Sequence, residues 1–367
     1  MKNPFAAEEI GWISPSLNRL RIVELPGIEL PEQVQGKLAF DLLSSDAVKS
    51  MIRPFTDELG LTSANVNLIT GLDRCFSVGP PEARARARAL ARQYGRNLGY
   101  VLLALKRGDA ANRNARAEWS DEHWEFWGTI NSILVGGGLS AGSFGQIAVD
   151  EAASLVASEG FPEMSVQLTP YHKDLSVIGA GRFAPVGTEA ALLADFGHSH
   201  VKQACAMYED GVMVEIHHFA DLDAPCQEFM DGDGSLEAIM RQAEWMQAAI
   251  AVSWHEAIEL GLDPEPTVIA SLACYMHHGQ PYSTEMGCYG RLQLLDDNLQ
   301  EFFADQLSLQ LEMPVYLRLI QDGTAAAAVY AGSQNCAVLT LGTAVGVGFP
   351  AAEKGLMRIA PQLGAVN

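Results

Sequence analysis

Several features of other protein classes are missing from this sequence. Nowhere do 18 uncharged apolar residues run together, so no segment has the length of a membrane-spanning helix. The N-terminus carries Glu8 and Glu9 and lacks the apolar segment of a secretory signal peptide. The six cysteines show no Cys-x-x-Cys spacing, which argues against a zinc site and against a disulfide framework. These absences predict a cytoplasmic protein without membrane contact.

Basic residues are scarce as well. The chain has 24 Lys and Arg against 45 Asp and Glu, a formal net charge of −21. Nucleic acids and anionic membranes are bound through clustered Lys and Arg, so neither is an expected partner. The same charge opposes the approach of an anionic nucleotide, so a phosphate site would need local donors and Mg²⁺.

The length and the hydrophobic patterns predict two α/β domains. At 367 residues the chain is longer than one hydrophobic core usually supports. Apolar strand-like runs alternate with segments of helical periodicity, which is typical of an α/β fold with mixed sheets. Helices are expected over 82–107, 144–158, 236–260 and 292–311, and strands over 130–135, 165–168, 190–194, 213–219, 267–273, 315–320 and 337–341.

The helix expected over 82–107 places Arg84, Arg88, Arg92 and Arg96 on one face. This row is either an anion-binding strip or a solvated or oligomer-facing surface. The second interpretation is the commoner one, and it leaves a homodimer open.

Two glycine-bearing segments follow apolar runs, where backbone N–H groups at a tight turn can meet phosphates. They read Asp195-Phe196-Gly197-His198-Ser199-His200-Val201-Lys202 and Gly342-Thr343-Ala344-Val345-Gly346-Val347-Gly348. Either segment alone is weak, because a turn aspartate, an exposed strand lysine or a plain hairpin gives the same pattern. Together they favour an ATP-dependent enzyme.

These segments resemble the first and second phosphate motifs of the sugar kinase, actin and chaperone ATPase superfamily. The run from Val135 to Ser140, with Gly136, Gly137 and Gly138, is similar to its glycine-rich adenosine motif. The run from Met313 to Ala326 is similar to the strand and turn in which bacterial sugar kinases of the repressor, open-reading-frame, kinase (ROK) group place a catalytic aspartate. The resemblance covers most of residues 84–350 and implies a two-domain actin-like ATPase (ribonuclease H-like) fold.

The resemblance also implies roles for single residues. Asp195 would orient Mg²⁺ through water, and Asp322 would be the general base, although a helix-capping aspartate is the competing interpretation of Asp322. The cofactors would be ATP and Mg²⁺. The residues expected at the nucleotide are Asp195, Gly197, Ser199, Lys202, Gly342, Thr343, Gly346 and Gly348, with Gly136, Gly137 and Gly138 at the adenosine.

The order of the motifs indicates a circular permutation. In the family the adenosine motif comes last, whereas here the cluster at Gly136 precedes Asp195, and only 19 residues follow Gly348. We therefore expect residues 185–330 to form domain I, and residues 1–184 with 331–367 to form domain II. The alternative is that the Gly136 cluster is an ordinary strand-to-helix turn in an unrelated N-terminal domain.

Departures from the family leave the substrate open. Gln321 stands where the family has Asn before the aspartate, and neither the Glu-x-x-x-Gly-His sugar element nor the cysteine-rich zinc motif is visible. A loop over 275–281 follows a strand, and with Gln321 it supplies the expected substrate contacts through His278, Gly279 and Gln280. Four histidines near the first phosphate motif could gather at a metal, but paired histidines on neighbouring strands are more often surface or core residues: His198, His200, His217 and His218.

The sequence thus predicts phosphoryl transfer from MgATP to a hydroxyl of a small polar metabolite, a sugar or sugar derivative. Two other functions stay open. One is a non-catalytic nucleotide- or sugar-binding protein of the same fold, and the other is an ATPase or acid-anhydride hydrolase.

Overall fold

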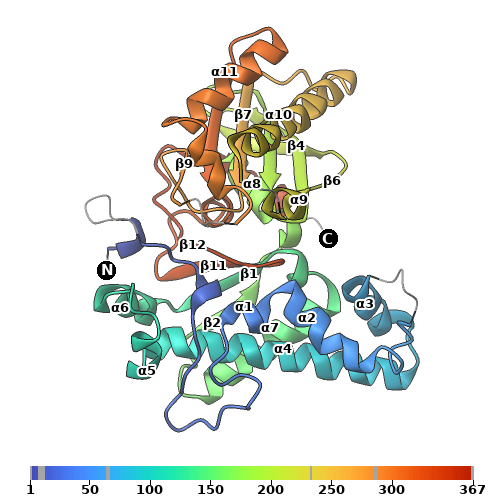
Figure 1. Cartoon of the computed structure of the whole chain (residues 1–367), viewed down its shortest axis with the longest axis vertical. Coiled ribbons are helices and arrows are strands. Elements are labelled where there is room, and N and C mark those ends of the chain that lie inside the picture. Colours follow the sequence, from blue (N-terminus) through green and yellow to red (C-terminus); the bar gives the residue numbers. More distant parts are fainter. Residues whose placement is uncertain (1, 7–12, 63–66, 232–233, 284–286, 365–367) are drawn as a thin grey trace. The chain divides into compact units, whose positions relative to one another are not determined.

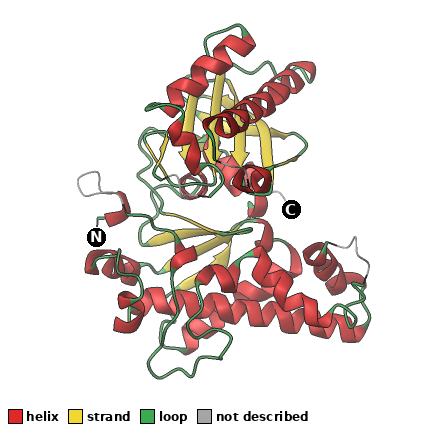
Figure 2. Cartoon of the chain, viewed as in Figure 1, coloured by secondary structure: helices red, strands yellow, loops and turns green. Residues whose placement is uncertain are grey.

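A computed structural model describes residues 2–6, 13–62, 67–231, 234–283 and 287–364. The chain forms two compact units, the first made of residues 1–173 with 334–347 and the second of residues 174–333 with 348–367 (Figure 1). Helices and strands alternate in both units (Figure 2), and the larger sheet contains both parallel and antiparallel pairs. The protein is therefore α/β with mixed sheets, as predicted.

The first unit is built on a four-stranded sheet. Its strand order is β12 (Val345–Gly348), β11 (Cys336–Leu341), β1 (Ser132–Gly136) and β2 (Ser165–Leu168). β1 is parallel to both β11 and β2. The strands that end at Val135 and Leu341 are therefore neighbours despite their separation in sequence, in agreement with the expectation that they share a domain.

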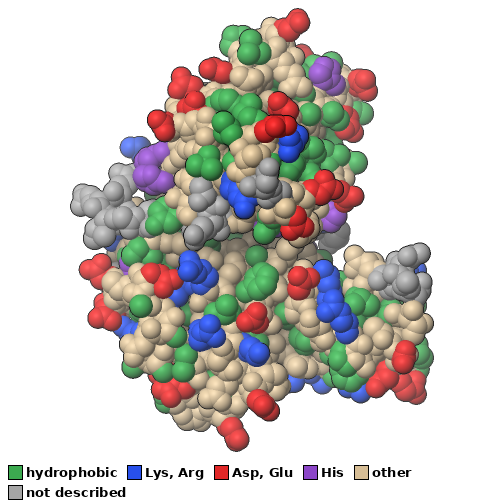
Figure 3. All heavy atoms as spheres, viewed as in Figure 1, with side chains coloured by type: hydrophobic (Ala, Val, Ile, Leu, Met, Phe, Trp, Pro, Cys, Tyr) green, Lys and Arg blue, Asp and Glu red, His purple; other side chains and the backbone are tan. Residues whose placement is uncertain are grey.

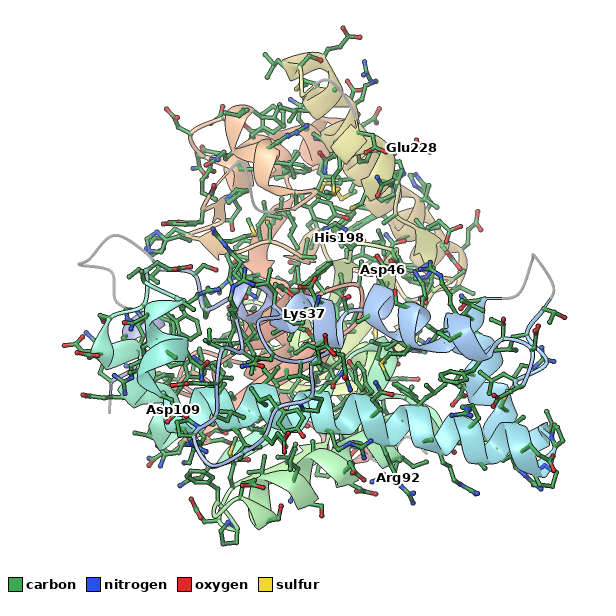
Figure 4. All side chains as sticks on the ribbon, turned by 60° about the horizontal axis from the view of Figure 1, so that its bottom comes forward. Lys37, Asp46, Arg92, Asp109, His198 and Glu228 are labelled. Atoms are coloured by element: carbon green, nitrogen blue, oxygen red, sulfur yellow. The ribbon has the colours of Figure 1, made fainter. Side chains whose placement is uncertain are left out.

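Two long helices, α4 (Pro81–Arg107) and α7 (Gly142–Ser158), pack against each other in the first unit (Figure 1). Glycines make the close approach feasible, because a Cβ on Gly99 would lie 2.8 Å from the Leu155 side chain. Arg96 Nη1 lies 2.8 Å from Glu151 on α7, and Arg92 lies 4.0 Å from the same carboxylate (Figure 4 labels Arg92). Glu151 on α7 is therefore the ion-pair partner of two of the four arginines in the row.

Further helices of this unit lie between residues 39 and 129, and the sequence patterns predicted none of them. They are α1 (Ala39–Leu43), α2 (Ser45–Ile52), α3 (Leu68–Val78), α5 (Ala110–Asn114) and α6 (Asp121–Thr129). No helix in the described residues is long and apolar enough to cross a membrane.

The second unit contains a seven-stranded sheet in which parallel and antiparallel strands meet at β3. β7 and β10 lie parallel on one side of β3, and an antiparallel meander through β4 and β5 lies on the other. The main path is β10 (Tyr316–Gln321), β7 (Thr267–Leu272), β3 (Ala190–Phe196), β4 (His200–Glu209), β5 (Val212–His218) and β13 (Arg358–Ile359), with β6 (Leu222–Asp223) paired to β4.

Helices α10 (Leu236–Glu259) and α11 (Leu299–Leu311) share one hydrophobic core with β3, β7 and β10 (Figure 1). α11 begins seven residues later than predicted, because Asn298 caps it by accepting the Glu301 N–H. Shorter helices are α8 (Leu175–Gly181), α9 (Cys226–Asp231) and α12 (Asp322–Ala328), and a small hairpin joins β8 (Met276–His277) to β9 (Gln280–Pro281).

The unit boundaries place residues 331–333 in the second unit and differ from the predicted domains in two further segments. Residues 348–367 belong to the second unit because β13 pairs in parallel with β5, and Arg182 Nε donates to the Met357 carbonyl at 2.7 Å. Residues 174–184 also belong there, since Tyr208 Oη donates to the Gly181 carbonyl at 2.8 Å. Both segments are short, and neither carries a long apolar run that would have revealed its partner.

The turn after β1 generates a stability prediction. Gly137 has φ of 90°, and a Cβ there would collide with the Leu341 carbonyl and lie 2.6 Å from Leu341 N, whereas a Cβ on Gly138 meets nothing within 4 Å. We expect Gly137→Ala to destabilise the protein by about 1–3 kcal/mol, the cost of a strained backbone position. Gly138→Ala should change stability by less than about 0.5 kcal/mol. Urea denaturation of both variants measures the difference, and equal stabilities would contradict the packing at Gly137.

Candidate active site

Strand register brings three polar side chains together in the second unit. Asp195 on β3 lies directly opposite Lys202 on β4 and directly opposite Ser271 on β7. Directly opposed residues project to the same face of a sheet. Ser271 Oγ accordingly donates to Asp195 Oδ1 at 2.6 Å, and Lys202 Nζ lies 3.4 Å from Asp195 Oδ2.

Asp195 suits a hard cation that keeps most of its water. Its side chain is buried at 5% exposure, with one oxygen held by a hydroxyl and the other beside an ammonium. The described residues contain no group of three or more His, Cys, Asp or Glu that could hold a metal. Mg²⁺ commonly binds through one or two carboxylates together with substrate phosphates. These residues therefore fit Mg²⁺ held with a nucleotide better than a metal enclosed by protein ligands.

A second carboxylate, Asp322, follows β10. This strand runs parallel to β7 with Ile320 opposite Ser271, so it ends at the same edge of the sheet as β3 and β7. Asp322 is half-buried, and its Oδ1 accepts from Gly323 N at 2.7 Å and from Gln321 Nε2 at 3.2 Å. Two donors therefore fix one oxygen of this carboxylate.

The cap of α12 comes from Gln321. Its Oε1 accepts from Thr324 N at 2.9 Å and from Thr324 Oγ1 at 2.8 Å. Gln321 thus performs the capping that was the competing interpretation of Asp322. The same side chain positions the Asp322 carboxylate through its amide nitrogen, so this glutamine has a structural function that does not require substrate.

Burial and the negative charge of Asp195 together raise the pKa of Asp322 to about 7, against the opposing effects of the Gly323 and Gln321 hydrogen bonds and the Lys202 charge. A carboxylate that titrates near neutrality can accept a proton at physiological pH, which an ordinary aspartate does poorly. Strongly perturbed carboxylates of this kind cluster at functional sites.

The predicted phosphate turn between β3 and β4 is tight. Gly197 N donates to the His200 carbonyl at 3.1 Å, and a Cβ on Gly197 would lie 2.8 Å from that oxygen. The buried Tyr289 Oη donates to the Gly197 carbonyl at 2.9 Å, and this hydrogen bond stabilises the turn. Ser199 is exposed on the turn. Its neighbour His198 is labelled in Figure 4, and burial lowers the pKa of this histidine.

A cavity of about 450 Å³ lies beside Gln321. The two-residue turn between β8 and β9 forms part of its wall, with φ of 49° at His278 and 76° at Gly279. The lining residues are Phe183, Met276, His278, Gly279, Gln300, Tyr316, Arg318, Leu319, Ile320, Gln321 and Thr324. Three of the four expected substrate residues therefore meet at one cavity.

Gln280, the fourth expected substrate residue, is not among the lining residues. Its Nε2 donates to the Asp296 carbonyl at 2.9 Å, and its Oε1 accepts from Leu299 N at 2.8 Å. Gln280 therefore fixes the start of α11. The sequence alone does not show whether a residue beside this glycine turn lines the cavity or holds a helix in place.

The remaining glycine motifs lie at strand ends of the first unit. Gly136 ends β1, and Gly137 and Gly138 follow it in the turn before α7. The close packing of Gly137 against Leu341 requires a glycine at this position even when no ligand is bound. After β11, the Gly342 carbonyl accepts from Ser45 N at 2.8 Å. Thr343 and Gly346 are partly exposed, whereas Gly348 belongs to the second unit and lies against the Gly323 carbonyl.

Sequence reasoning overlooked Ser271 and Arg318. A serine inside an apolar strand looks like a core residue until its register with Asp195 is known.

The histidines do not gather: His200 pairs with Asp223 at 3.2 Å and His217 with Glu215 at 3.1 Å. Neither pair contributes to a metal cluster among the residues that the structure describes.

Comparison with known proteins adds no family to this description. No protein-family model matches the chain, and no curated protein sequence matches it significantly.

The pKa of Asp322 predicts a pH-dependent effect on stability. Because its folded pKa of about 7 exceeds its ordinary value of 3.8, the folded state retains a proton that the unfolded state loses between these pH values. Wild-type stability from this group therefore falls as pH rises from about 4 to about 7. Asp322→Asn keeps an acceptor for Gly323 N without the buried charge. The free energy of unfolding of the variant, relative to that of wild type, should increase by up to about 4 kcal/mol between pH 4 and pH 8, since each unit of pKa shift corresponds to about 1.4 kcal/mol. Urea unfolding at both pH values measures this, and a difference independent of pH would contradict the raised pKa.

Proposed function

We propose that the protein transfers a phosphoryl group from MgATP to a hydroxyl of a small polar metabolite. The observation that carries this proposal is the pair Asp195 and Asp322 at one edge of the sheet, with the pKa of Asp322 near neutrality. Phosphoryl transfer needs a group that accepts the hydroxyl proton and a charged site that positions the phosphates. The two carboxylates match these two tasks.

The resemblance of the sequence motifs supports an assignment to the actin-like ATPase fold. The first phosphate motif forms a β-strand, a tight glycine turn and a second strand, and the proposed catalytic aspartate follows a buried parallel strand directly. In this proposal Gly197 and Ser199 approach the phosphates. The roles expected for Gly342, Thr343, Gly346 and Gly348 at the phosphates, and for Gly136, Gly137 and Gly138 at the adenosine, rest on the sequence resemblance alone.

When bound, MgATP supplies the phosphoryl group and part of the charge neutralisation that its transfer requires. Asp195 would hold the metal ion, which would neutralise charge on the phosphates, and Lys202 lies 3.4 Å from the same carboxylate and contributes a positive charge there. Asp322 would accept the proton of the acceptor hydroxyl while that oxygen forms a bond to the γ-phosphorus, the bond from this phosphorus to the β–γ bridging oxygen breaks, and ADP leaves. Gln321 and Gly323 hold the carboxylate in place during this step.

Asp322→Asn tests the catalytic role. The variant retains the hydrogen-bonding shape but loses the base, and general-base assistance is typically worth about 10² to 10⁴ in rate. We expect transfer of radioactive phosphate from ATP to a polyol panel to fall at least about a hundredfold, while ATP binding measured by calorimetry stays within about threefold. A variant with near-normal turnover would remove Asp322 from the mechanism.

The pH profile gives an independent check on the same residue. Since only the deprotonated carboxylate accepts a proton, kcat/KM, which reports the free enzyme, should rise about tenfold per pH unit below about 7 and level off above it. Hydrolysis of ATP without any acceptor requirement would instead identify an ATPase. Failure of the wild-type protein to bind MgATP at all would overturn the proposal.

A further inference from the structure

We propose that the cavity beside Gln321 binds the anionic group of an acidic polyol, and that Arg318 is the residue that recognises it. This inference rests on the proposed function, because it assigns a chemical class to the phosphoryl acceptor. The shared chemistry is a carboxylate or phosphate monoester on a small polyhydroxylated molecule.

Arg318 is prepared for a ligand by its surroundings. Its guanidinium lies over the Phe183 ring, 4.7 Å from the centroid, and both residues line the cavity. Stacking on an aromatic ring holds the planar guanidinium while leaving its edge N–H donors available. Within the described residues, no carboxylate lies within 4.0 Å of this arginine.

The charge of the cavity is unusual for this protein. The chain has a formal net charge of −21, and acidic side chains are spread over the visible face of the second unit (Figure 3). Among the residues that the structure describes, the cavity lining nevertheless contains Arg318 and His278 but no Asp or Glu. A cation without a counter-charge in a concave site attracts an anion, and a guanidinium forms two parallel hydrogen bonds with a carboxylate or phosphate.

The other polar groups of the cavity suit hydroxyls. Gln300 Oε1 accepts from Leu319 N at 2.9 Å, so the amide group that remains for a ligand is the donor Nε2. His278 lies in the left-handed region with φ of 49°, a conformation that non-glycine residues rarely adopt, and it is one of the residues that line the cavity. The volume of about 450 Å³ is within the range of small-molecule sites, about 300–1,000 Å³.

The strand sets the separation between the anion site and the proposed base. Arg318 and Asp322 are four residues apart at the end of β10, which corresponds to about 13 Å between Cα atoms for an extended strand. Gln321 both lines the cavity and hydrogen-bonds Asp322. A polyol whose anionic group binds Arg318 could therefore present its opposite end toward the base.

Ligand binding without nucleotide tests the inference separately from phosphoryl transfer. The probes are D-gluconate, D-glucose 6-phosphate and the neutral polyol D-sorbitol, each titrated calorimetrically into the full chain. We expect wild type to bind at least one acidic probe and to bind D-sorbitol at least about tenfold more weakly, because hydrogen bonds to charged groups contribute more than neutral ones. Gluconate alone would identify the carboxylate class, and glucose 6-phosphate alone the phosphate class.

Arg318→Met retains the length of the side chain and removes its charge, so it should weaken binding of the preferred acidic probe about 10- to 100-fold. Arg318→Lys should be intermediate, since it keeps the charge but loses the planar fork. The matched control is Arg241→Met, which removes an exposed arginine paired with Glu237 on α10 and should bind like wild type.

Thermal melting of each variant shows whether the fold is retained. Equal binding of acidic and neutral probes, or full acidic-probe affinity in a folded Arg318→Met variant, would overturn the inference. Acidic-probe binding that depends on Arg318, in a protein that transfers no phosphate, would instead uphold the anion site and refute the proposed function.

Discussion

The parallel alignment of β3, β7 and β10 is the constraint on which the candidate site depends. It places Asp195 opposite Ser271, and Ser271 opposite Ile320 on β10. β10 ends one residue after Ile320, so Asp322 follows at the edge of the sheet where β3 and β7 also end. The two carboxylates are close enough to interact electrostatically, and the negative charge of Asp195 adds to burial in raising the pKa of Asp322. A shift of one residue in the register of β3 would turn Asp195 to the other face of the sheet.

The two carboxylates are held by different donors. Asp195 receives a hydroxyl hydrogen bond and lies beside an ammonium, whereas Asp322 receives a backbone N–H and a side-chain amide. Lys202 is placed by register beside Asp195, and its charge only partly offsets the effect of burial on Asp322. Paired carboxylates in unlike environments can divide the tasks of holding charge and moving a proton.

Much of the secondary structure followed from the sequence. The periodicity over 82–107 and the apolar run over 165–168 correspond to α4 and β2, because local patterns determine these elements. The start of α11 was misplaced because a side-chain cap at Asn298 outweighed the continuing apolar pattern. Short pairings such as β13 with β5 depend on contacts distant in sequence and leave no local pattern.

The candidate site was only partly predictable for the same reason. The sequence identified Asp195 and Asp322 as chemical groups, and the structure adds Ser271 through strand register. The capping by Gln321 depends on the orientation of one amide, which a sequence pattern does not specify. Arg318 looked like an ordinary strand residue. Its candidate role comes from its contact with the Phe183 ring and from the lack of Asp and Glu among the described residues that line the cavity.

The most direct measurement of the central claim is the pKa of Asp322 itself. A ¹³C NMR titration of selectively labelled aspartate, with Asp322→Asn used to assign the resonance, reports this carboxyl in the folded protein. The account predicts a pKa of about 7 in wild type and a lower value in Asp195→Asn, where the neighbouring negative charge is removed. A wild-type pKa near 4, unchanged by Asp195→Asn, would contradict both the burial of Asp322 and its coupling to Asp195.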